Sequence, residues 1–417
     1  MTTTTRAVTE APIWSSSPFG ELDLARMRRQ RGEKLRAEMA KQGVPALLLL
    51  GGGSVQYAVG AETLGVDSAR AGHRRTAALV VAGDDEPHLF TPYPEGAPPE
   101  LSADHVHDAL VLESDGGVGL LAGVLGELAG GEPERLALDD MSGAMHRLLP
   151  GLLPKTELVD CGRIMVPAKV LKTDDELECI HRAHRINELA MYDVQQYLRP
   201  GLRQSDLSAL FLRRIYELGC TSNGIDPIWQ VIPSTKEGFP WTTSGELAFP
   251  LTTTDRILAE GDVIWCDTGI HYQGYASDFG RTWIVSRDPK PTAAQREAFR
   301  RWRDVVAATL AVTRPGATGA QLAAAAKAAD KGHRTPWLSH FYLIHGLGTE
   351  SAEAPMIGTD MGEEHDEALV LAPGMVLVLE PVIWDEGVGG YRAEDIVGVT
   401  EDGWVALSDY PYDPYES

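Results

Sequence analysis

The sequence is poor in cysteine and lacks long uninterrupted apolar runs. Its 417 residues include four cysteines, at positions 161, 179, 220 and 266. Their spacing fits neither a sulfur-ligated zinc site nor a dense disulfide framework, so we expect a protein of the reducing cytoplasm. No stretch is long enough to cross a bilayer, and residues 1–20 lack the apolar run of a signal peptide. We therefore expect a cytoplasmic protein without a membrane partner.

Basic residues are also scarce. The chain has 37 Lys and Arg against 60 Asp and Glu, which gives a formal net charge of −23. Binding to nucleic acid relies on basic surfaces that neutralise phosphates, so nucleic acid is not an expected partner. The hydrophobic fraction of 43% is sufficient for a large core, and the length indicates more than one domain.

Several familiar catalytic motifs are absent. The sequence contains neither a Gly-x-Ser-x-Gly nucleophile motif nor a His-Glu-x-x-His zinc motif. The glycines at 51–53 lack the lysine of a phosphate-binding loop, and residues 117–122 fit a dinucleotide motif only loosely. The histidines at positions 73, 105, 107 and 271 are scattered, and we interpret each as a surface or core residue rather than a ligand, although His73 could enter the site of a neighbouring subunit.

What the chain does contain is a duplication. In each copy an apolar strand runs from a glycine to an acid, and a Gly-Tyr strand then leads to a second acid. The copies are Gly261–Asp267 with Gly274–Asp278, and Gly374–Glu380 with Gly390–Glu394. An Arg-Pro-Gly turn also recurs, at 199–201 and 314–316. The repetition predicts two similar halves about a pseudo-twofold axis, with the acids of both halves at one central site.

The four acids of this site need compensating charge. Buried carboxylates are costly unless they are paired or bind metal, and two divalent ions would largely neutralise Asp267, Asp278, Glu380 and Glu394. His345 lies between the two copies and offers a nitrogen ligand. One imidazole among four carboxylates suits Mn, Fe(II), Co or Zn. We predict a site for two divalent metal ions with these five ligands.

The segments that carry these residues resemble a known family. They are Asp267–Arg281, His345–Pro355, Gly374–Pro381 and Gly390–Glu394. They resemble the pita-bread metallopeptidases, which include methionine aminopeptidase, aminopeptidase P, prolidase and creatinase. The resemblance covers essentially the whole chain, although the N-terminal half matches only in organisation. It implies an α+β protein with a creatinase-like α/β domain at 1–168, a pseudo-twofold pita-bread catalytic domain at 169–417, and a homodimer.

The resemblance also implies roles for the ligands. Asp267 would bind one metal bidentately, Asp278 and Glu394 would bridge both ions, and His345 with Glu380 would complete the second site. Glu380 is also the usual proton carrier in this family. The favoured ions are Mn or Fe, and such a pair lowers the pKa of a bridging water and polarises the scissile group.

This sequence departs from the family at two histidines. The family string His-Gly-x-Gly-x-Glu-x-His-Glu-Ala-Pro is here His345–Pro355, with Ala352 at the second histidine. A further family histidine is missing from the segment 244–256, where Phe249, Pro250 and Leu251 stand. In the peptidases these groups hold the peptide and stabilise charge at the carbonyl, and one good donor contributes about 2.7–4 kcal/mol. Their loss argues against an efficient ordinary prolidase.

Two other acids are candidate catalytic groups. Glu350 or Glu353 could act as acid or base if the metal site desolvates one of them and raises its pKa; alternatively each is an ordinary helix-start or loop acid. Arg392, two residues before Glu394, is predicted to bond the ligand carboxylates. Arg281 is either a second such partner or a surface strand residue.

Three functions follow from these observations. The first is a metal-dependent hydrolase of the Xaa-Pro dipeptidase or aminopeptidase type, acting on a dipeptide or another small amide. The second is a metal-dependent non-peptidase that cleaves a C–N or C–S bond of a small metabolite, similar to ectoine hydrolase or dimethylsulfoniopropionate lyase. The pair Pro240-Trp241 faintly favours the lyase, but Gly269 stands where those lyases carry an additional ligand acid. The third is a metal-free binding protein.

Local patterns predict the elements around these motifs. In the N-terminal half, a helix is expected at 22–42, strands at 46–50 and 136–139, and a hairpin from 76–81 to 87–91. Thr173 and Glu176 have the spacing of a capping box and should begin a long helix.

Overall fold

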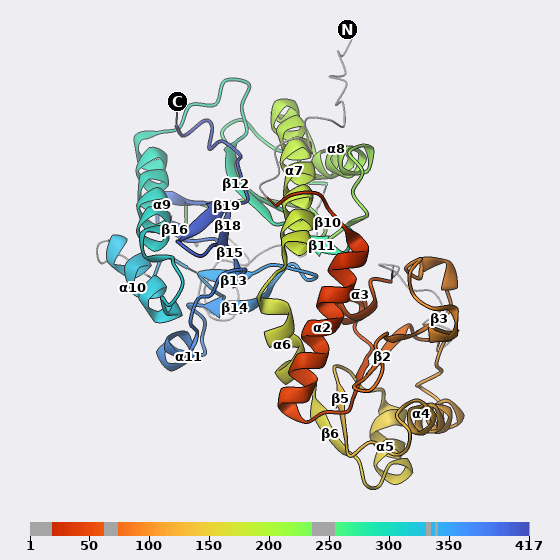
Figure 1. The fold of residues 1–417 in the computed structure, drawn as a ribbon. Helices are drawn as coiled ribbons and strands as arrows, with labels where there is room; N and C mark the ends of the chain where they lie inside the picture. The colour runs from red at the N-terminus through yellow and green to blue at the C-terminus, as the bar shows by residue number, and fades with distance from the viewer. Residues whose placement is uncertain (1–18, 62–73, 236–254, 331–334, 338–340, 417) are drawn as a thin grey trace. The chain divides into compact units, whose positions relative to one another are not determined.

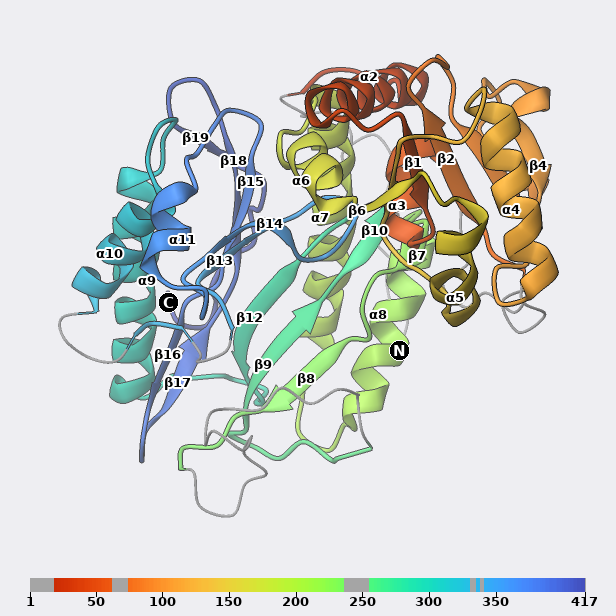
Figure 2. The same cartoon turned by 90° about the horizontal axis from the view of Figure 1, so that it is seen from below.

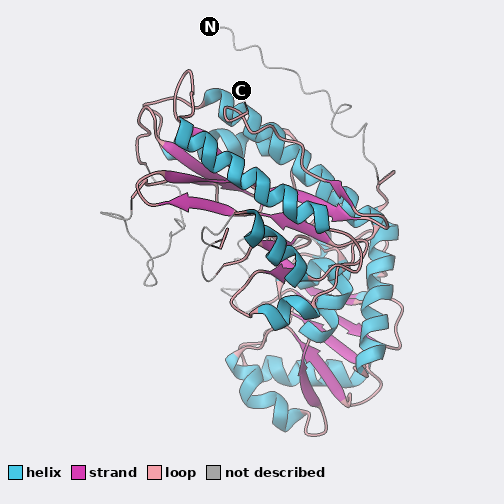
Figure 3. Cartoon of the chain, turned by 90° about the vertical axis from the view of Figure 1, so that its left-hand side faces the viewer, coloured by secondary structure: helices cyan, strands magenta, loops and turns pink. Residues whose placement is uncertain are grey.

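The structure is a computed structural model that describes residues 19–61, 74–235, 255–330, 335–337 and 341–416. The chain separates into two compact units, one of residues 21–169 and one built mainly from residues 170–417. Each unit has its own sheets lined by helices (Figures 1 and 3).

The N-terminal unit is built on one six-stranded sheet with the order β4-β3-β2-β1-β5-β6. Its strands are β1 (Ala46–Leu49), β2 (Ala77–Val81), β3 (His88–Thr91), β4 (Val106–Asp108), β5 (Arg135–Leu138) and β6 (Glu157–Asp160). The helices are α2 (Leu24–Gln42), α3 (Gly52–Val59), α4 (Asp115–Leu128), α5 (Gly143–Leu152) and α6 (Gly162–Val170), with short 3-10 turns η2 (Pro94–Gly96) and η3 (Ala103–His105). Alternate residues of β1 enter two separate hydrophobic clusters, so both faces of the sheet are covered.

The local predictions for this unit are confirmed. Asp23 caps α2 through its side chain and Gly43 ends the helix in the left-handed conformation. Strands β2 and β3 form the expected antiparallel hairpin, and β1 pairs with β5 in parallel. The helix and the hairpin depend on nearby residues, which is why the sequence pattern predicts them, whereas the pairing of β1 with β5 joins segments far apart in the chain and was not predicted.

The first half of the C-terminal unit contains, among its described residues, two helices and two small sheets. The helices are α7 (Asp174–Tyr197) and α8 (Gln204–Glu217), and the strands are β7 (Ser222–Asn223), β8 (Ile228–Val231), β9 (Val263–Thr268), β10 (Ile270–Tyr272), β11 (Tyr275–Ala276) and β12 (Phe279–Ile284). The sheets have the orders β12-β9-β8 and β11-β10-β7. The capping box of Thr173 and Glu176 begins α7 as predicted.

The second half repeats this plan with a larger sheet. Its helices are α9 (Ala293–Val312), α10 (Gly319–Ala329) and α11 (Glu363–Ala368). Its strands are β13 (Ile344–Gly346), β14 (Glu353–Ile357), β15 (Val376–Leu379), β16 (Val382–Asp385), β17 (Gly389–Arg392), β18 (Asp395–Val399) and β19 (Trp404–Ala406). The main sheet has the order β14-β13-β15-β18-β19, with β16-β17 as a separate pair. Helices α9 and α10 lie along the strands of this half (Figure 2).

The duplication extends to individual backbone hydrogen bonds. The glycine of each Arg-Pro-Gly turn has positive φ, 88° at Gly201 and 83° at Gly316. Their amides donate to Leu258 O at 2.8 Å and to Leu371 O at 2.9 Å. The glycines that begin the two copies also match: the amide of Gly261 donates to Val285 O, just after β12, at 2.8 Å, and that of Gly374 donates to Val399 O, at the end of β18, at 2.9 Å. The two halves therefore share one folding plan.

The Gly-Tyr run of each copy lies in a different sheet from the first strand of that copy. The Gly-Tyr runs do not pair with the first strand of each copy, because β11 pairs with β10 and β17 pairs with β16. The acids that follow these runs instead lead into β12 and β18, which pair with β9 and β15. A short apolar pattern does not show where one strand ends and the next begins.

Candidate metal centre

The structure brings the five predicted ligands together at the ends of paired strands. Asp267 lies in β9 opposite Gly280, and Asp278 directly precedes β12. Glu380 follows β15 and Glu394 precedes β18. The residues next to them, Leu379 and Asp395, are paired with each other across these two strands. His345 lies in β13, which pairs with β15.

The side chains converge closely. His345 Nε2 lies 3.2 Å from Asp278 Oδ2 and 3.2 Å from Glu380 Oε1. One carboxylate oxygen from each of Asp267, Asp278 and Glu394 lies within 4.8 Å of the other two. The side chains of His345, Glu380 and Glu394 are at most 2% exposed, and those of Asp278 and Asp267 are 11% and 13% exposed. The arrangement is a buried set of carboxylate oxygens with one imidazole.

Arg392 binds three of the four acids. Its Nη2 donates to Asp267 Oδ2 at 3.0 Å, to Glu380 Oε2 at 2.7 Å and to Glu394 Oε1 at 2.6 Å. Its backbone amide donates to Thr282 Oγ1 of β12 at 3.0 Å, and this bond fixes the backbone from which the Arg392 side chain extends. As predicted, Arg392 is a partner of these carboxylates, and its charge partly offsets theirs.

Arg281 acts on the backbone of the site. It is buried, and its Nη1 donates to the carbonyl oxygens of Gly280 and Glu394, at 2.8 and 2.5 Å. Gly280 itself must lack a side chain, because a Cβ atom there would lie 2.7 Å from Cδ of Glu394. Arg281 and Gly280 together set the position of the Glu394 carboxylate.

Burial and mutual repulsion change the proton affinity of the cluster. Burial, together with the Asp278 and Glu380 charges, raises the pKa of Asp267 to about 7. Burial likewise raises the pKa of Glu394 well above its ordinary value. Although burial alone would lower the pKa of His345, its bonds to Asp278 and Glu380 raise that pKa to about 10. Despite burial, the bond from His345 keeps the pKa of Asp278 below its ordinary value.

This donor set fits divalent cations. Among the residues that the structure describes, Asp267 Oδ1 and Glu394 Oε2 are buried without a hydrogen-bond partner. Orphaned buried carboxylate oxygens are costly, and a cation bound between them would remove that cost. Oxygen-rich sites with one imidazole are typical of Mn, Fe(II), Co or Zn.

The predicted catalytic acids other than Glu380 have different surroundings. Glu353 is buried at the start of β14, and its Oε1 accepts a hydrogen bond from Lys172 Nζ at 2.8 Å. A Cβ atom on Gly348 would lie 2.2 Å from the same oxygen, so this motif glycine makes room for Glu353. Glu350 is exposed, and Ala352 is half-buried. The roles assigned to Glu350 and Glu353 stay predictions.

Tyr342 is a further residue of this site, and no sequence motif indicated it. Its ring packs edge-to-face against His345, with 4.9 Å between centroids, and stacks on Phe341 at 4.0 Å. Burial and the nearby charges of Glu380 and Asp278 raise the pKa of this phenol. No sequence pattern marks an aromatic residue shortly before a strand as part of a site. The one available signal was the position of Tyr342 three residues before the predicted ligand His345.

Other residues named from the sequence lie elsewhere or outside the described part of the chain. His271 lies in β10, where burial lowers its pKa, and contacts Ser222 Oγ at 3.4 Å. His73, the pair Pro240-Trp241 and the residues Phe249, Pro250 and Leu251 lie outside the described residues. No helix among the described residues is long and apolar enough to span a membrane.

Comparison with known proteins agrees with this geometry. Residues 178–401 match the metallopeptidase family M24, and residues 31–167 match the creatinase/prolidase N-terminal domain. The chain belongs to metallopeptidase family M24. This confirms the predicted family, its α+β fold with a creatinase-like N-terminal domain and a pita-bread catalytic domain, and the enzyme class of metal-dependent hydrolases.

Similarity to individual proteins extends over nearly the whole chain. A protein of Mycobacterium tuberculosis named probable dipeptidase PepE is 28% identical over 405 residues, which cover 90% of this chain and 93% of the relative. Creatinase of a Bacillus species is 25% identical over 402 residues, covering 92% and 91%. The fold is similar to that of the prolidase from Pyrococcus horikoshii, with a TM-score of 0.73 at 21% identity and coverage of 92% and 99%.

Proposed function

We propose that this M24 protein is a dinuclear metal-dependent hydrolase that acts on an Xaa-Pro dipeptide or a similar small amide. The observation that carries the proposal is the convergence of Asp267, Asp278, His345, Glu380 and Glu394, with the buried Asp267 Oδ1 and Glu394 Oε2 atoms left without a hydrogen-bond partner among the described residues. The likeness to a protein named as a dipeptidase over 90% of the chain supports a dipeptide substrate.

The five residues would hold two divalent ions, with Mn or Fe favoured. Such ions supply Lewis-acid polarisation of the scissile carbonyl and a water of lowered pKa. Glu380 contacts His345 through one oxygen and Arg392 through the other. It is therefore held in a fixed orientation, from which it can accept a proton and return it to the leaving amine.

Tyr342 is proposed as a replacement for one missing histidine. A phenol is protonated at neutral pH, and burial together with the nearby negative charges raises the pKa of this one further. Such a hydroxyl can donate a hydrogen bond to an oxygen that becomes negative in the transition state. That is the task which the family histidines normally perform.

The remaining expectations concern the whole protein. We propose that residues 1–168 form the N-terminal domain and residues 169–417 the catalytic domain, that the protein forms a homodimer, and that it acts in the cytoplasm. The separation into units near residue 169 supports this division.

A second candidate is a metal-dependent reaction on a small metabolite other than a peptide. The observation that favours it is Ala352, which leaves a half-buried methyl group where a family histidine would contact substrate. The likeness to a creatinase over 92% of the chain also supports a non-peptide substrate. Glu350 and Glu353 remain the candidate proton carriers for such a reaction.

The test is cleavage of Ala-Pro by the purified Mn-loaded protein, beside the Asp278→Asn variant. Asp288→Asn is the matched control, because Asp288 is 78% exposed and pairs with Lys290 outside the cluster. Cleavage that Asp278→Asn abolishes and Asp288→Asn leaves unchanged supports the dipeptidase. Bound metal without cleavage overturns it in favour of the second candidate, and absence of metal affinity would support a metal-free binding protein.

A further inference from the structure

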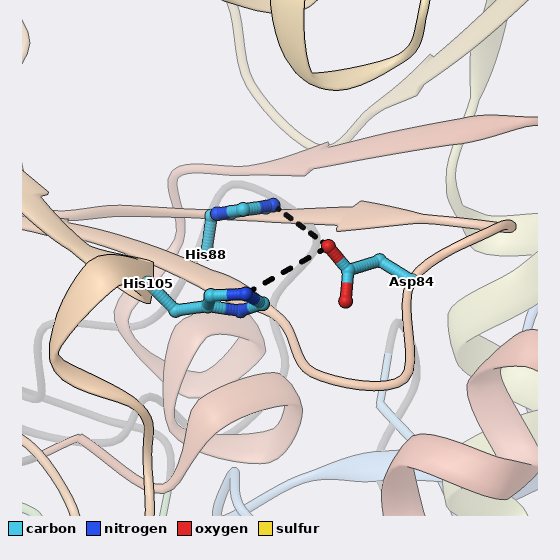
Figure 4. A group of neighbouring side chains, drawn as sticks. All are labelled: Asp84, His88 and His105. Carbon is cyan, nitrogen blue, oxygen red and sulfur yellow. Dashed lines mark ion pairs between the residues drawn. The ribbon is translucent and has the colours of Figure 1, made fainter.

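A second group of possible metal ligands lies in the N-terminal unit. Asp84 stands in the turn between β2 and β3, His88 begins β3, and His105 ends the 3-10 turn η3 that leads into the edge strand β4. Figure 4 shows the two imidazoles beside the same carboxylate oxygen. His88 Nε2 lies 3.2 Å and His105 Nε2 3.9 Å from Asp84 Oδ2.

We propose that Asp84, His88 and His105 form a binding site for a divalent transition-metal ion of the zinc class, separate from the carboxylate centre. Two imidazoles with one carboxylate are a common ligand set for zinc, which leaves a fourth position for water. The site would join the hairpin turn to the edge strand of the sheet.

The distances suit such an ion. An ion with tetrahedral bonds of about 2.0–2.1 Å separates its ligand atoms by roughly 3.4 Å. The His88 to Asp84 separation is 3.2 Å, and one atom from each of the three residues already lies within 4.8 Å of the others. The rings of His88 and His105 are stacked 4.3 Å apart at 20°, so binding requires the His105 ring to turn toward Asp84.

Neighbouring residues hold the ligands in place. Glu86 accepts hydrogen bonds from the amide and hydroxyl of Ser102, at 2.9 and 3.0 Å, and so ties the start of η3 to the hairpin. His88 Nδ1 lies 3.0 Å from His107 Nε2, and His107 in turn stacks on Phe90. A hydrogen bond from Nδ1 to His107 would leave Nε2 of His88 free of a proton and aimed at Asp84, as is usual for metal-binding histidines.

The burial of the cluster also fits a site rather than a chance surface contact. His88 is 4% exposed, and Asp84 and His105 are half-buried. Nδ1 of His105 is buried without a hydrogen-bond partner among the described residues, whereas Nε2 of that ring faces Asp84 Oδ2 and is the nitrogen that would bind the ion. In sequence His105 and His107 are scattered, and the pairing of β3 with β4 brings both beside His88.

The test counts zinc retained by the full-length protein after dialysis. The wild-type protein should retain one zinc equivalent more than the His105→Ala and Asp84→Asn variants. The control is His146→Ala, at an exposed helix residue in the same unit, and its zinc content should equal that of the wild type. Asp84→Asn preserves the side-chain shape, which guards against a folding defect. Equal zinc content in all four proteins, each folded by circular dichroism, would overturn the proposal.

A spectroscopic test separates this site from the carboxylate centre. In a His345→Ala background the predicted ligands of that centre contain no imidazole. Pulsed EPR of the Cu²⁺-loaded protein should then detect two bound imidazoles, and one after His105→Ala is added. Replacing His107 with Ala should weaken the site about 10- to 100-fold. Detection of no bound imidazole would contradict the proposal, whatever the outcome of the dipeptide assay.

Discussion

At the scale of single residues, the balance of charge in the candidate centre depends on Arg392. Its guanidinium contacts Asp267, Glu380 and Glu394 at once, and it is 2% exposed. The sequence predicted this contact from the position of Arg392 two residues before Glu394; in the structure Arg392 ends β17, and Glu394 lies between β17 and β18. It did not predict Tyr342 or the partner of Glu353, since Lys172 lies 181 residues away in the chain.

Removal of Arg392 should destabilise the metal-free protein more than the metal-loaded protein. Loss of one member of a buried ion pair costs about 3–5 kcal/mol, and bound cations would replace part of its charge. We expect Arg392→Gln to lower the melting temperature strongly in EDTA and less strongly with Mn²⁺. Arg300→Gln is the control, because Arg300 is 67% exposed. An equal decrease in melting temperature in EDTA and with Mn²⁺ would contradict this role of Arg392.

Tyr342→Phe should reduce turnover without reducing metal content. If the hydroxyl donates to the developing oxyanion, its removal should lower kcat by about 10²- to 10³-fold. Tyr216→Phe is a matched control, since Tyr216 is 56% exposed. Steady-state kinetics on Ala-Pro with metal analysis distinguish the outcomes, and an unchanged kcat would remove Tyr342 from the proposed chemistry.

At the scale of elements, strands β9, β12, β15 and β18 position the ligands. Caps and the N-terminal hairpin were predictable because they depend on residues close in sequence, such as Thr173 and Glu176. The strands that pair with the Gly-Tyr strands were not predictable. These partners are β10 and β16, and no local sequence pattern indicates the pairing. The position of the acids was still predictable, since the duplication repeats it.

The fit between β12 and Glu394 gives a prediction at this scale. Gly280→Ala places a methyl group against the Glu394 carboxylate, so metal affinity and activity should both fall while the fold is retained. Gly403→Ala is the control, because no atom lies within 4 Å of a Cβ there. Calorimetric titration with Mn²⁺ checks the prediction, and wild-type affinity in Gly280→Ala would refute it.

At the scale of the whole molecule, metal binding should be coupled to pH. In the metal-free protein the pKa of His345 is raised to about 10 and that of Asp267 to about 7. Both groups must lose their protons to bind metal, so affinity should increase as pH rises from 6 to 9, by roughly tenfold per pH unit for each proton released. Titration in two buffers of different ionisation enthalpy measures this proton release. An affinity independent of pH would contradict the assigned ligands.

The central claim is that both halves of the duplicated unit supply ligands to one pair of metal ions. Anomalous diffraction from crystals of the Mn-loaded protein tests it most directly. The account predicts two Mn peaks among the carboxylates of Asp267, Asp278, Glu380 and Glu394, with His345 bound to one of them. Mn-saturated crystals with no peak at these five residues would contradict it.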